Sequence, residues 1–460
     1  MAADDEKAKL FKRLYSASLH AVLERMRVHG FWPTGVELPG PPPEETRERS
    51  KIQAELSALE SLAGAVQNPQ QALQQERIRR WQDSKTRRAA NRAALLAKLK
   101  KAREDYAAYR KTTIVHAGVG VSAGLQPTGG DPSQLLARGL PVLQTAAELA
   151  TALSITIPRL RWLTYHRRAA VLVHYHRFGI PKKTGGIRNI SAPKRDLART
   201  QAWVLANILS KLRTEPEAHG FVPGRSVVSN ALPHVGRAVV FNMDLKDFFP
   251  TITFRRVRGL FAKLGYNSQV ATLLALLCTE PPRVAAELDG KVFHIALSAR
   301  RLPQGACTSP AITNAICRKL DRRLAGLAKR HSAAFTRYAD DLTFSVDDTL
   351  AIGPLLKSAR SIVIAEGFAE HPDKTRVMRK GRRQEVTGVT VNQKVAVPRD
   401  EVRELRAILH NAKKHGLESQ NRKAHPHFAA YLRGRIAWVH MVDPQRAAKL
   451  SAAFAALGGT

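Results

Sequence analysis

Two adjacent aspartates, Asp340 and Asp341, lie between two segments that have the composition of β-strands. They follow Tyr338 and Ala339, so the sequence Tyr-Ala-Asp-Asp stands where a tight turn would join the two strands. This pattern predicts a β-hairpin with two carboxylates at its tip. Neighbouring carboxylates repel each other unless a proton or a cation neutralises them, and an oxygen-ligated Mg²⁺ ion would do so. An ordinary aspartate-rich turn is the alternative interpretation of these four residues alone.

A third carboxylate, Asp244, follows the apolar residues 239–243, which have the pattern of a buried strand. A carboxylate at the end of a buried strand is costly unless it is paired or binds a metal. If this strand lies beside the predicted hairpin, Asp244, Asp340 and Asp341 converge. Two Mg²⁺ ions held by the three carboxylates would activate a 3′-hydroxyl group and stabilise a leaving pyrophosphate.

The net charge predicts a polyanionic partner. The chain of 460 residues carries 74 Lys and Arg against 38 Asp and Glu, a formal charge of +36. Nucleic acid is the first candidate partner and an anionic membrane surface is the second. No apolar run is as long as a membrane span, and the polar N-terminus does not have the pattern of a secretory signal. With three cysteines in no metal-binding or disulfide pattern, these features predict a cytoplasmic protein without membrane segments.

The chain divides by composition into an N-terminal extension and a larger α+β region. Residues 1–111 form a basic, mostly helical extension in which residues 77–111 are an exposed charged surface or an RNA contact. Residues 112–140, rich in Gly, Ser, Pro and Thr, have the composition of a flexible linker. After the linker, strands and helices alternate irregularly, which indicates an α+β fold. From residue 397 the pattern is helical to the end.

Three segments together resemble the motifs of reverse transcriptases. They are NMDLKDFF, which contains Asp244, LPQGACTSP at residues 302–310, and the Tyr-Ala-Asp-Asp turn. Two more resemble elements of the bacterial retron enzymes: Asn230 to His234 (NALPH, matching NAxxH) and residues 386–388 (VTG). Cys307 stands where the family usually has proline, and its small side chain is compatible with packing. The resemblance covers residues 141–460 and does not extend to the first 140.

The resemblance implies a right-hand polymerase. Residues 141–235 would form the fingers and the start of the palm, residues 236–396 a palm with an antiparallel sheet and an insertion that belongs to the fingers, and residues 397–460 a helical thumb. Asp244 and Asp340 would be direct ligands of two Mg²⁺ ions, with Asp341 in support. Phe249 falls at the steric gate that excludes the 2′-hydroxyl of ribonucleotides, although a core position is the alternative. The other implied nucleotide-binding residues are Lys182, Arg188, Gln304, Gly305 and Lys374.

The resemblance also implies an RNA-binding surface. Asn230 and His234 would lie near the template and primer, unless they only stabilise local structure. The C-terminal helices carry basic residues interleaved with apolar ones, which fits a thumb that grips a duplex by its phosphates. A solvated basic face is the alternative. The candidate RNA-binding residues of this region are Arg403, Arg406, Arg433 and Arg435.

A retron enzyme copies a cognate structured noncoding RNA into branched msDNA from an RNA 2′-hydroxyl, so the implied partners are this RNA, its RNA–DNA product and dNTPs. A role in anti-phage defence and an effector protein are implied by family alone. Two alternatives stay open at this level. One is a reverse transcriptase of group II intron or diversity-generating type. The other is a nonpolymerising RNA-binding scaffold of a toxin–antitoxin-like system, against which the three intact aspartates argue.

Overall fold

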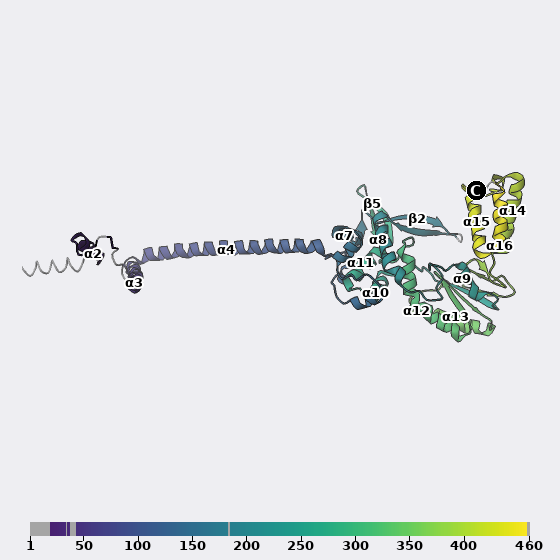
Figure 1. Cartoon of the computed structure of the whole chain (residues 1–460), viewed down its shortest axis with the longest axis horizontal. Coiled ribbons are helices and arrows are strands. Elements are labelled where there is room, and N and C mark those ends of the chain that lie inside the picture. The colour runs from purple at the N-terminus through teal and green to yellow at the C-terminus, as the bar shows by residue number, and fades with distance from the viewer. Residues whose placement is uncertain (1–18, 34, 37–42, 183–184, 458–460) are drawn as a thin grey trace, which may run out of the picture. The chain divides into compact units, whose positions relative to one another are not determined.

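The computed structural model describes residues 19–33, 35–36, 43–182 and 185–457. It separates into an N-terminal unit that ends at Glu104 and a C-terminal unit from Asp105 to Thr460. The architecture mixes helices with antiparallel sheets, which confirms the predicted α+β class (Figure 1). Within the described ranges, no helix is long and apolar enough to cross a bilayer.

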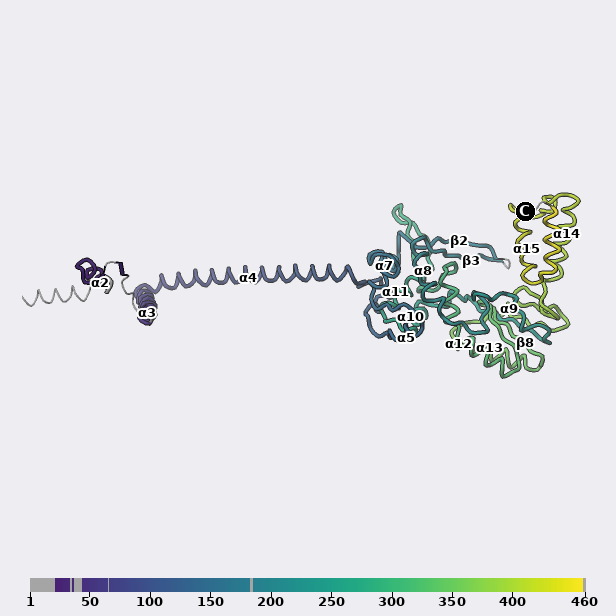
Figure 2. Tube along the Cα trace, in the orientation of Figure 1, coloured from purple at the N-terminus to yellow at the C-terminus, as the bar shows by residue number. Residues whose placement is uncertain are grey.

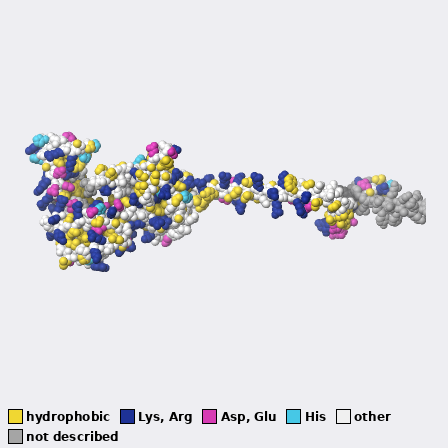
Figure 3. Space-filling view, turned by 180° about the vertical axis from the view of Figure 1, so that it is seen from behind, with side chains coloured by type: hydrophobic (Ala, Val, Ile, Leu, Met, Phe, Trp, Pro, Cys, Tyr) yellow, Lys and Arg dark blue, Asp and Glu magenta, His cyan; other side chains and the backbone are white. Residues whose placement is uncertain are grey.

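The N-terminal helices confirm the predicted helical extension. They are α2 (Leu19–Val28), α3 (Pro43–Gln67) and α4 (Pro69–Thr112). Both long helices begin with proline, which suits the first turn because its missing N–H has no partner there. Their interiors are rich in the strong helix formers Ala, Leu, Gln, Glu, Lys and Arg. None of the described residues of α4 is buried, and dark-blue Lys and Arg side chains lie along it in Figure 3.

The predicted flexible linker is wrong. Residues 113–140 run along the C-terminal unit and place Ile114, Leu125, Leu135 and Leu140 in its main core. The glycines of this segment allow close packing rather than flexibility. A Cβ atom on Gly118 would lie 2.0 Å from the carbonyl oxygen of His166, so only glycine fits there. Two short elements, η1 (Ser122–Gly124) and α5 (Pro132–Ala137), belong to this segment.

The centre of the C-terminal unit, which we call the palm, is a four-stranded antiparallel sheet in the order β7-β8-β4-β9. Phe241 on β4 and Phe344 on β8 stack at 4.9 Å and join the main core, to which the flanking helices α12 and α13 contribute. The opposite side chain, Val240, packs in a smaller cluster with Ala231 and Val386. Both faces of the sheet are therefore covered. The bounds are β4 (Val239–Asp244), β7 (Ala334–Tyr338), β8 (Asp341–Val346), β9 (Arg376–Arg379), α12 (Thr308–Arg330) and α13 (Ile352–Ala365).

A second group of elements, which we call the fingers, contains the β-hairpin that carries Lys182 and Arg188. The hairpin strands β2 and β3 run side by side in Figure 2, and a separate sheet has the order β1-β6-β5. Residues 183 and 184 of the hairpin turn lie outside the described residues. Helix α11 is buried from Gln269 to its last residue, Cys278. The bounds are α6 (Ala146–Ala152), α7 (Ile157–Thr164), β1 (Ala169–Ala170), β2 (Tyr175–Pro181), β3 (Ile187–Pro193), α8 (Arg195–Asn207), α10 (Phe254–Leu264), α11 (Ser268–Cys278), β5 (Arg283–Leu288) and β6 (Lys291–Ala296).

Three C-terminal helices, which we call the thumb, enclose a core of their own. The helices are α14 (Arg399–His415), α15 (Phe428–Val442) and α16 (Pro444–Ala455). Leu405, Leu432 and Leu450, one from each helix, meet in this core, so the apolar faces point inward and most of the basic side chains point outward. Two short strands, β10 (Glu385–Val386) and β11 (Val389–Thr390), lie between palm and thumb in the chain. Trp438 on α15 packs against the valine cluster that contains them.

Candidate active site

The Tyr-Ala-Asp-Asp segment forms the tip of the β7–β8 hairpin. Tyr338 pairs with Asp341 across the two strands, so Ala339 and Asp340 form the turn. Ala339 has a φ of 57°, a conformation that side chains other than glycine rarely adopt and that is frequent at functional sites. Asp244, the last residue of β4, lies directly opposite Asp341 in the register of the palm sheet. The sheet therefore brings the three predicted carboxylates to one end.

The three carboxylates interact electrostatically. Burial raises the pKa of Asp341 to about 7, with further contributions from the charges of Asp340 and Asp244. Burial and the charge of Asp244 also raise the pKa of Asp340. The Lys374 ammonium lies 2.9 Å from Asp244 Oδ1. The site thus concentrates carboxylates whose charge the nearby cations offset only in part.

The oxygen ligands and their mutual repulsion suit a hard divalent cation. In the part of the chain that the structure describes, no three His, Cys, Asp or Glu side chains form a ready-made metal cage. Mg²⁺ seldom needs such a cage, because it keeps several waters and binds substrate phosphates alongside one or two carboxylates. The donor set at Asp244, Asp340 and Asp341 is compatible with that mode of binding.

Several predicted nucleotide-binding residues line one cavity. Lys182 and Arg188 of the β2–β3 hairpin and Gln304 of the LPQG segment border a space of about 360 Å³, together with Asp247 and Arg301. The charge of Arg188 lowers the pKa of Asp340, which burial otherwise raises, so this guanidinium is within electrostatic reach of the carboxylates. A cavity with three cations next to an acidic centre suits a nucleoside triphosphate.

The LPQG segment is fixed to the fingers hairpin. The Ser191 amide donates a hydrogen bond to the Gln304 carbonyl at 2.7 Å. Gly305 has a φ of 112°, and a Cβ atom there would lie 2.8 Å from Ile190 Cγ2. The glycine is needed for this close approach and lies at the rim of the nucleotide cavity rather than in its lining.

The two phenylalanines after Asp247 have different environments. Phe248 is 3% exposed and belongs to the main core. Phe249 is half-buried, and its ring centroid lies 6.4 Å from that of Phe221. Phe249 also packs against the main core, so the sugar gate and the core position both stay predictions for this residue.

A buried ion pair supports the catalytic hairpin, and the sequence analysis missed it. Arg337, directly before Tyr338, donates hydrogen bonds at 2.6 and 2.8 Å to the two carboxylate oxygens of Asp321 on α12. A third bond, of 3.1 Å, runs from Arg337 to the carbonyl of Ala339 in the turn. An arginine inside an apolar strand was the available signal, because a charge in that position requires a partner.

We expect Arg337→Met to destabilise the protein by about 3–5 kcal/mol, because it leaves Asp321 buried without its partner. Chemical denaturation of the purified variant measures this directly. The matched control is Arg323→Met, which breaks a partly exposed ion pair with Glu366 and should cost at most about 1 kcal/mol. Equal losses in the two variants would contradict the role assigned to the buried pair.

The predicted template contact of Asn230 and His234 is wrong. Both side chains are fully buried. The ring nitrogens of His234 lie 2.7 Å from the Ser345 hydroxyl and 2.8 Å from that of Thr336, and burial lowers its pKa to about 3. Asn230 reaches Thr387 of the VTG segment at 3.4 Å. The two retron-type elements therefore contact each other within the protein. This agrees with the alternative interpretation, in which Asn230 and His234 only stabilise local structure.

The basic residues of the thumb do not share one environment. Arg403 and Arg406 on α14 and Arg433 on α15 are exposed. Arg435 forms an ion pair of 2.6 Å with Glu404 and lies over the Tyr431 ring. Arg435 is thus partly neutralised within the thumb and is the weakest of the four candidates for RNA contact.

Comparison with known proteins matches these features to a family. A profile of the family described as "Reverse transcriptase (RNA-dependent DNA polymerase)" matches residues 180–391. The retron Mx162 reverse transcriptase of Myxococcus xanthus is 43% identical over 390 residues, which cover 80% of this chain and 78% of that protein. The retron Mx65 enzyme of the same organism is 48% identical over 321 residues, covering 70% and 74%. The retron Ec86 enzyme of Escherichia coli is 34% identical over 274 residues, covering 59% and 79%.

Proposed function

Since the chain belongs to the retron reverse transcriptases and is an RNA-directed DNA polymerase, we propose that it copies part of one cognate noncoding RNA into DNA. The proposed primer is the 2′-hydroxyl of an internal guanosine of that RNA, so that the product is branched msDNA. The observation that carries the proposal is the convergence of Asp244, Asp340 and Asp341 beside a cavity lined by Lys182 and Arg188.

Each group has a role in nucleotide addition. Asp244, Asp340 and Asp341 would hold two Mg²⁺ ions, which when bound activate the attacking hydroxyl and neutralise the leaving pyrophosphate. Lys182 and Arg188 bind the triphosphate from the fingers side, with Gln304 and Gly305 beside the incoming nucleotide. Positioning and charge stabilisation of this kind account for most of phosphoryl transfer.

Lys374 has two roles in this proposal. In the present arrangement it neutralises Asp244 at 2.9 Å. With substrate bound, the same ammonium would turn to the triphosphate and donate a proton to the leaving pyrophosphate. Its position at the carboxylates supports the first role, and the second requires only a side-chain rotation of this exposed lysine.

The proposed priming reaction has a direct test. Purified protein, its cognate RNA, dNTPs and Mg²⁺ should yield DNA attached covalently to RNA, and a 2′,5′-debranching enzyme should release it. Replacing the priming guanosine by 2′-deoxyguanosine should remove this product, while extension of a DNA primer on a generic RNA template continues. A product that survives this replacement would contradict 2′-hydroxyl priming and leave the polymerase activity intact.

We expect Phe249→Ala to admit ribonucleotides. Removing the ring relieves the clash with the 2′-hydroxyl, and selection against ribonucleotides should fall by roughly 10- to 100-fold, the range of a single steric contact. Single-nucleotide incorporation with dNTPs and rNTPs measures the ratio of kcat/KM values. Phe249→Tyr is the control, because it keeps the ring and should keep the selectivity. An unchanged ratio in folded Phe249→Ala would return this residue to a packing role.

For recognition of the cognate RNA we propose the exposed face of the thumb, with Arg403, Arg406 and Arg433 on phosphates of a duplex segment. Arg435 orients this surface through its pair with Glu404. The biological role that we propose is anti-phage defence together with an effector protein. Loss of plaque protection on deletion of the gene, restored by the intact gene but not by an Asp340→Asn gene, would support that role, and equal plaque numbers would contradict it.

A further inference from the structure

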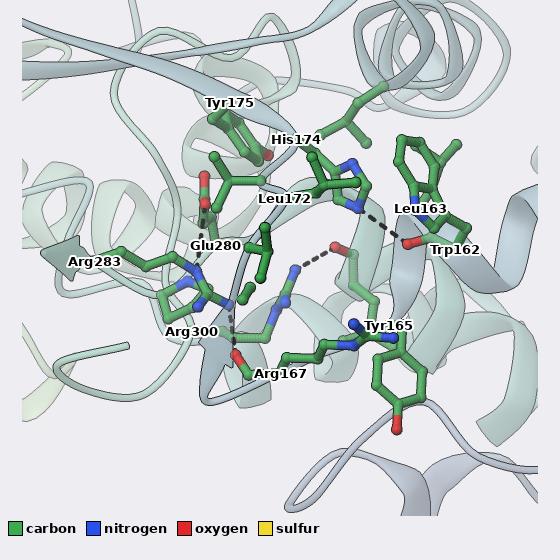
Figure 4. Close-up of a pocket in the computed structure, with 16 residues that line it drawn as sticks. Trp162, Leu163, Tyr165, Arg167, Leu172, His174, Tyr175, Glu280, Arg283 and Arg300 are labelled. Carbon is green, nitrogen blue, oxygen red and sulfur yellow. Dashed lines mark hydrogen bonds and ion pairs between the residues drawn. The ribbon is translucent and has the colours of Figure 1, made fainter. Parts of the chain in front are cut away.

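Two further cavities lie in and beside the fingers, and neither is lined by Asp244, Asp340 or Asp341. One has a volume of about 200 Å³ (Figure 4) and the other about 570 Å³. They adjoin each other, because Trp162, Tyr165 and Arg167 line both. We call the two together the fingers groove. The smaller cavity also shares the lining residues Glu280 and Pro281 with the nucleotide cavity, so the fingers groove and the nucleotide cavity are neighbours.

Three of the aromatic rings that line the fingers groove are each paired with a guanidinium group. Trp162 is 40% exposed, with the His174 ring at its edge at 4.3 Å and the Arg159 guanidinium 4.1 Å from its centroid. Arg167 lies 5.2 Å from the Tyr165 ring. At the far end, Arg110 lies 5.9 Å from the exposed Tyr106 ring. The close-up shows Trp162 and Tyr165 at the border of the smaller cavity.

The charge of the groove is strongly positive. Arg110, Arg161 and Arg167 line its larger cavity, where none of the described lining residues is acidic. Glu280 is the one carboxylate among the described residues of the smaller cavity, and Arg177 pairs with it. Burial lowers the pKa of His174, so this ring adds stacking surface rather than charge. The groove therefore selects an anionic ligand with flat rings.

We propose that the fingers groove binds an unpaired segment of RNA, with bases stacked on Trp162 and Tyr165 and phosphates paired with Arg110, Arg161 and Arg167. Stacking on aromatic side chains combined with a cationic groove is the general mode of single-strand binding. A duplex offers its phosphates but not its base faces, which are stacked inside the helix. The proposal rests on the proposed function only in taking RNA as the partner.

Binding measurements with the full chain test the groove. The probes are a fluorescent RNA hairpin with an unpaired oligouridine tail and the same hairpin without a tail. Trp162→Leu should weaken binding of the tailed RNA roughly tenfold, as expected for the loss of one base stack, and leave the blunt hairpin unchanged. Trp162→Phe keeps a stacking ring and should restore most of the affinity, which separates stacking from folding.

The arginines have a separate test with a matched charge control. For the tailed RNA, the affinity constant falls as salt rises. The double variant Arg161→Gln with Arg167→Gln should make this slope of log K against log salt less steep by about 1.4, that is about 0.7 for each phosphate that the variant no longer neutralises. The control variant Lys329→Gln with Arg330→Gln removes two exposed cations at the end of α12. Any change in salt dependence that it causes should be the same for the tailed and the blunt RNA.

Three results would overturn the proposal: no loss of affinity for the tailed RNA with Trp162→Leu, equal loss for both probes, or the same slope change in the arginine variant and its control. Addition of a single dNTP to an annealed primer by the unaltered protein is measured in parallel. A protein that adds no dNTP but still discriminates the tail would contradict the polymerase role on which the proposed function depends, and it would leave the groove assignment standing.

Discussion

The double substitution Asp340→Asn and Asp341→Asn should reduce RNA-templated DNA synthesis by about 10³-fold or more, as expected when electrostatic groups at the reacting centre are removed. RNA binding should persist, because the two carboxylates repel phosphates rather than bind them. Primer extension and equilibrium RNA binding on the same preparation measure the two effects. Extension at an undiminished rate would contradict the assignment of the site.

The same variant should not lose stability, which separates a catalytic from a structural role. Burial raises the pKa of Asp341 from its ordinary value of 3.8 to about 7. A carboxyl group whose pKa is higher in the folded state makes the protein less stable as the pH rises from that ordinary value towards 7. Asparagine removes this cost. The melting temperature of the variant should therefore equal or exceed that of the unaltered chain at pH 7 and above, and a lower value would indicate a structural role.

Deleting residues 1–140 should abolish folding, in contrast to what a flexible linker would predict. The deletion removes Ile114, Val121, Leu125 and Leu135 from the main core. At about 1.5–3 kcal/mol for each buried side chain, the loss is roughly 6–12 kcal/mol. That is comparable with the whole stability of a typical domain, about 5–15 kcal/mol. Thermal unfolding and solubility of the truncated chain are the measurements.

The control for this deletion starts at Asp105, where the C-terminal unit begins. This chain keeps every residue of the buried segment and should unfold cooperatively and extend a generic primer on RNA. Equal unfolding temperatures for the chains that start at Asp105 and at Pro141 would show that the segment contributes nothing to the core.

The sequence predicted those parts of the fold and of the site that are formed by residues close together in the chain. The Tyr-Ala-Asp-Asp hairpin and the apolar strand before Asp244 each carry their own signal. The cavity that unites Lys182, Arg188 and Gln304 was predictable only through the family resemblance, because segments far apart in the sequence form it.

Two kinds of feature could not be predicted from local patterns. The segment from Thr113 to Leu140 has few large apolar residues and many glycines, so its composition indicates a linker, although most of its large apolar side chains lie in the main core. Asn230 and His234 lie in a motif that identifies the family, and a motif does not reveal whether its residues face a ligand or the protein interior. Only the tertiary contacts to Thr387, Thr336 and Ser345 decide this.

The contact between the NAxxH and VTG elements has a consequence for the exchange of parts between related enzymes. Gly388 lies under the thumb, with the position of a Cβ atom 3.8 Å from Trp438 Cζ2. Asn230, the VTG segment and Trp438 thus form a continuous joint from the back of the palm to α15. A thumb exchanged with that of a relative would lose these contacts unless the residues at all three positions are exchanged with it. Under the proposed recognition of RNA by the thumb, the unit to exchange is therefore discontinuous in sequence and larger than the C-terminal helices.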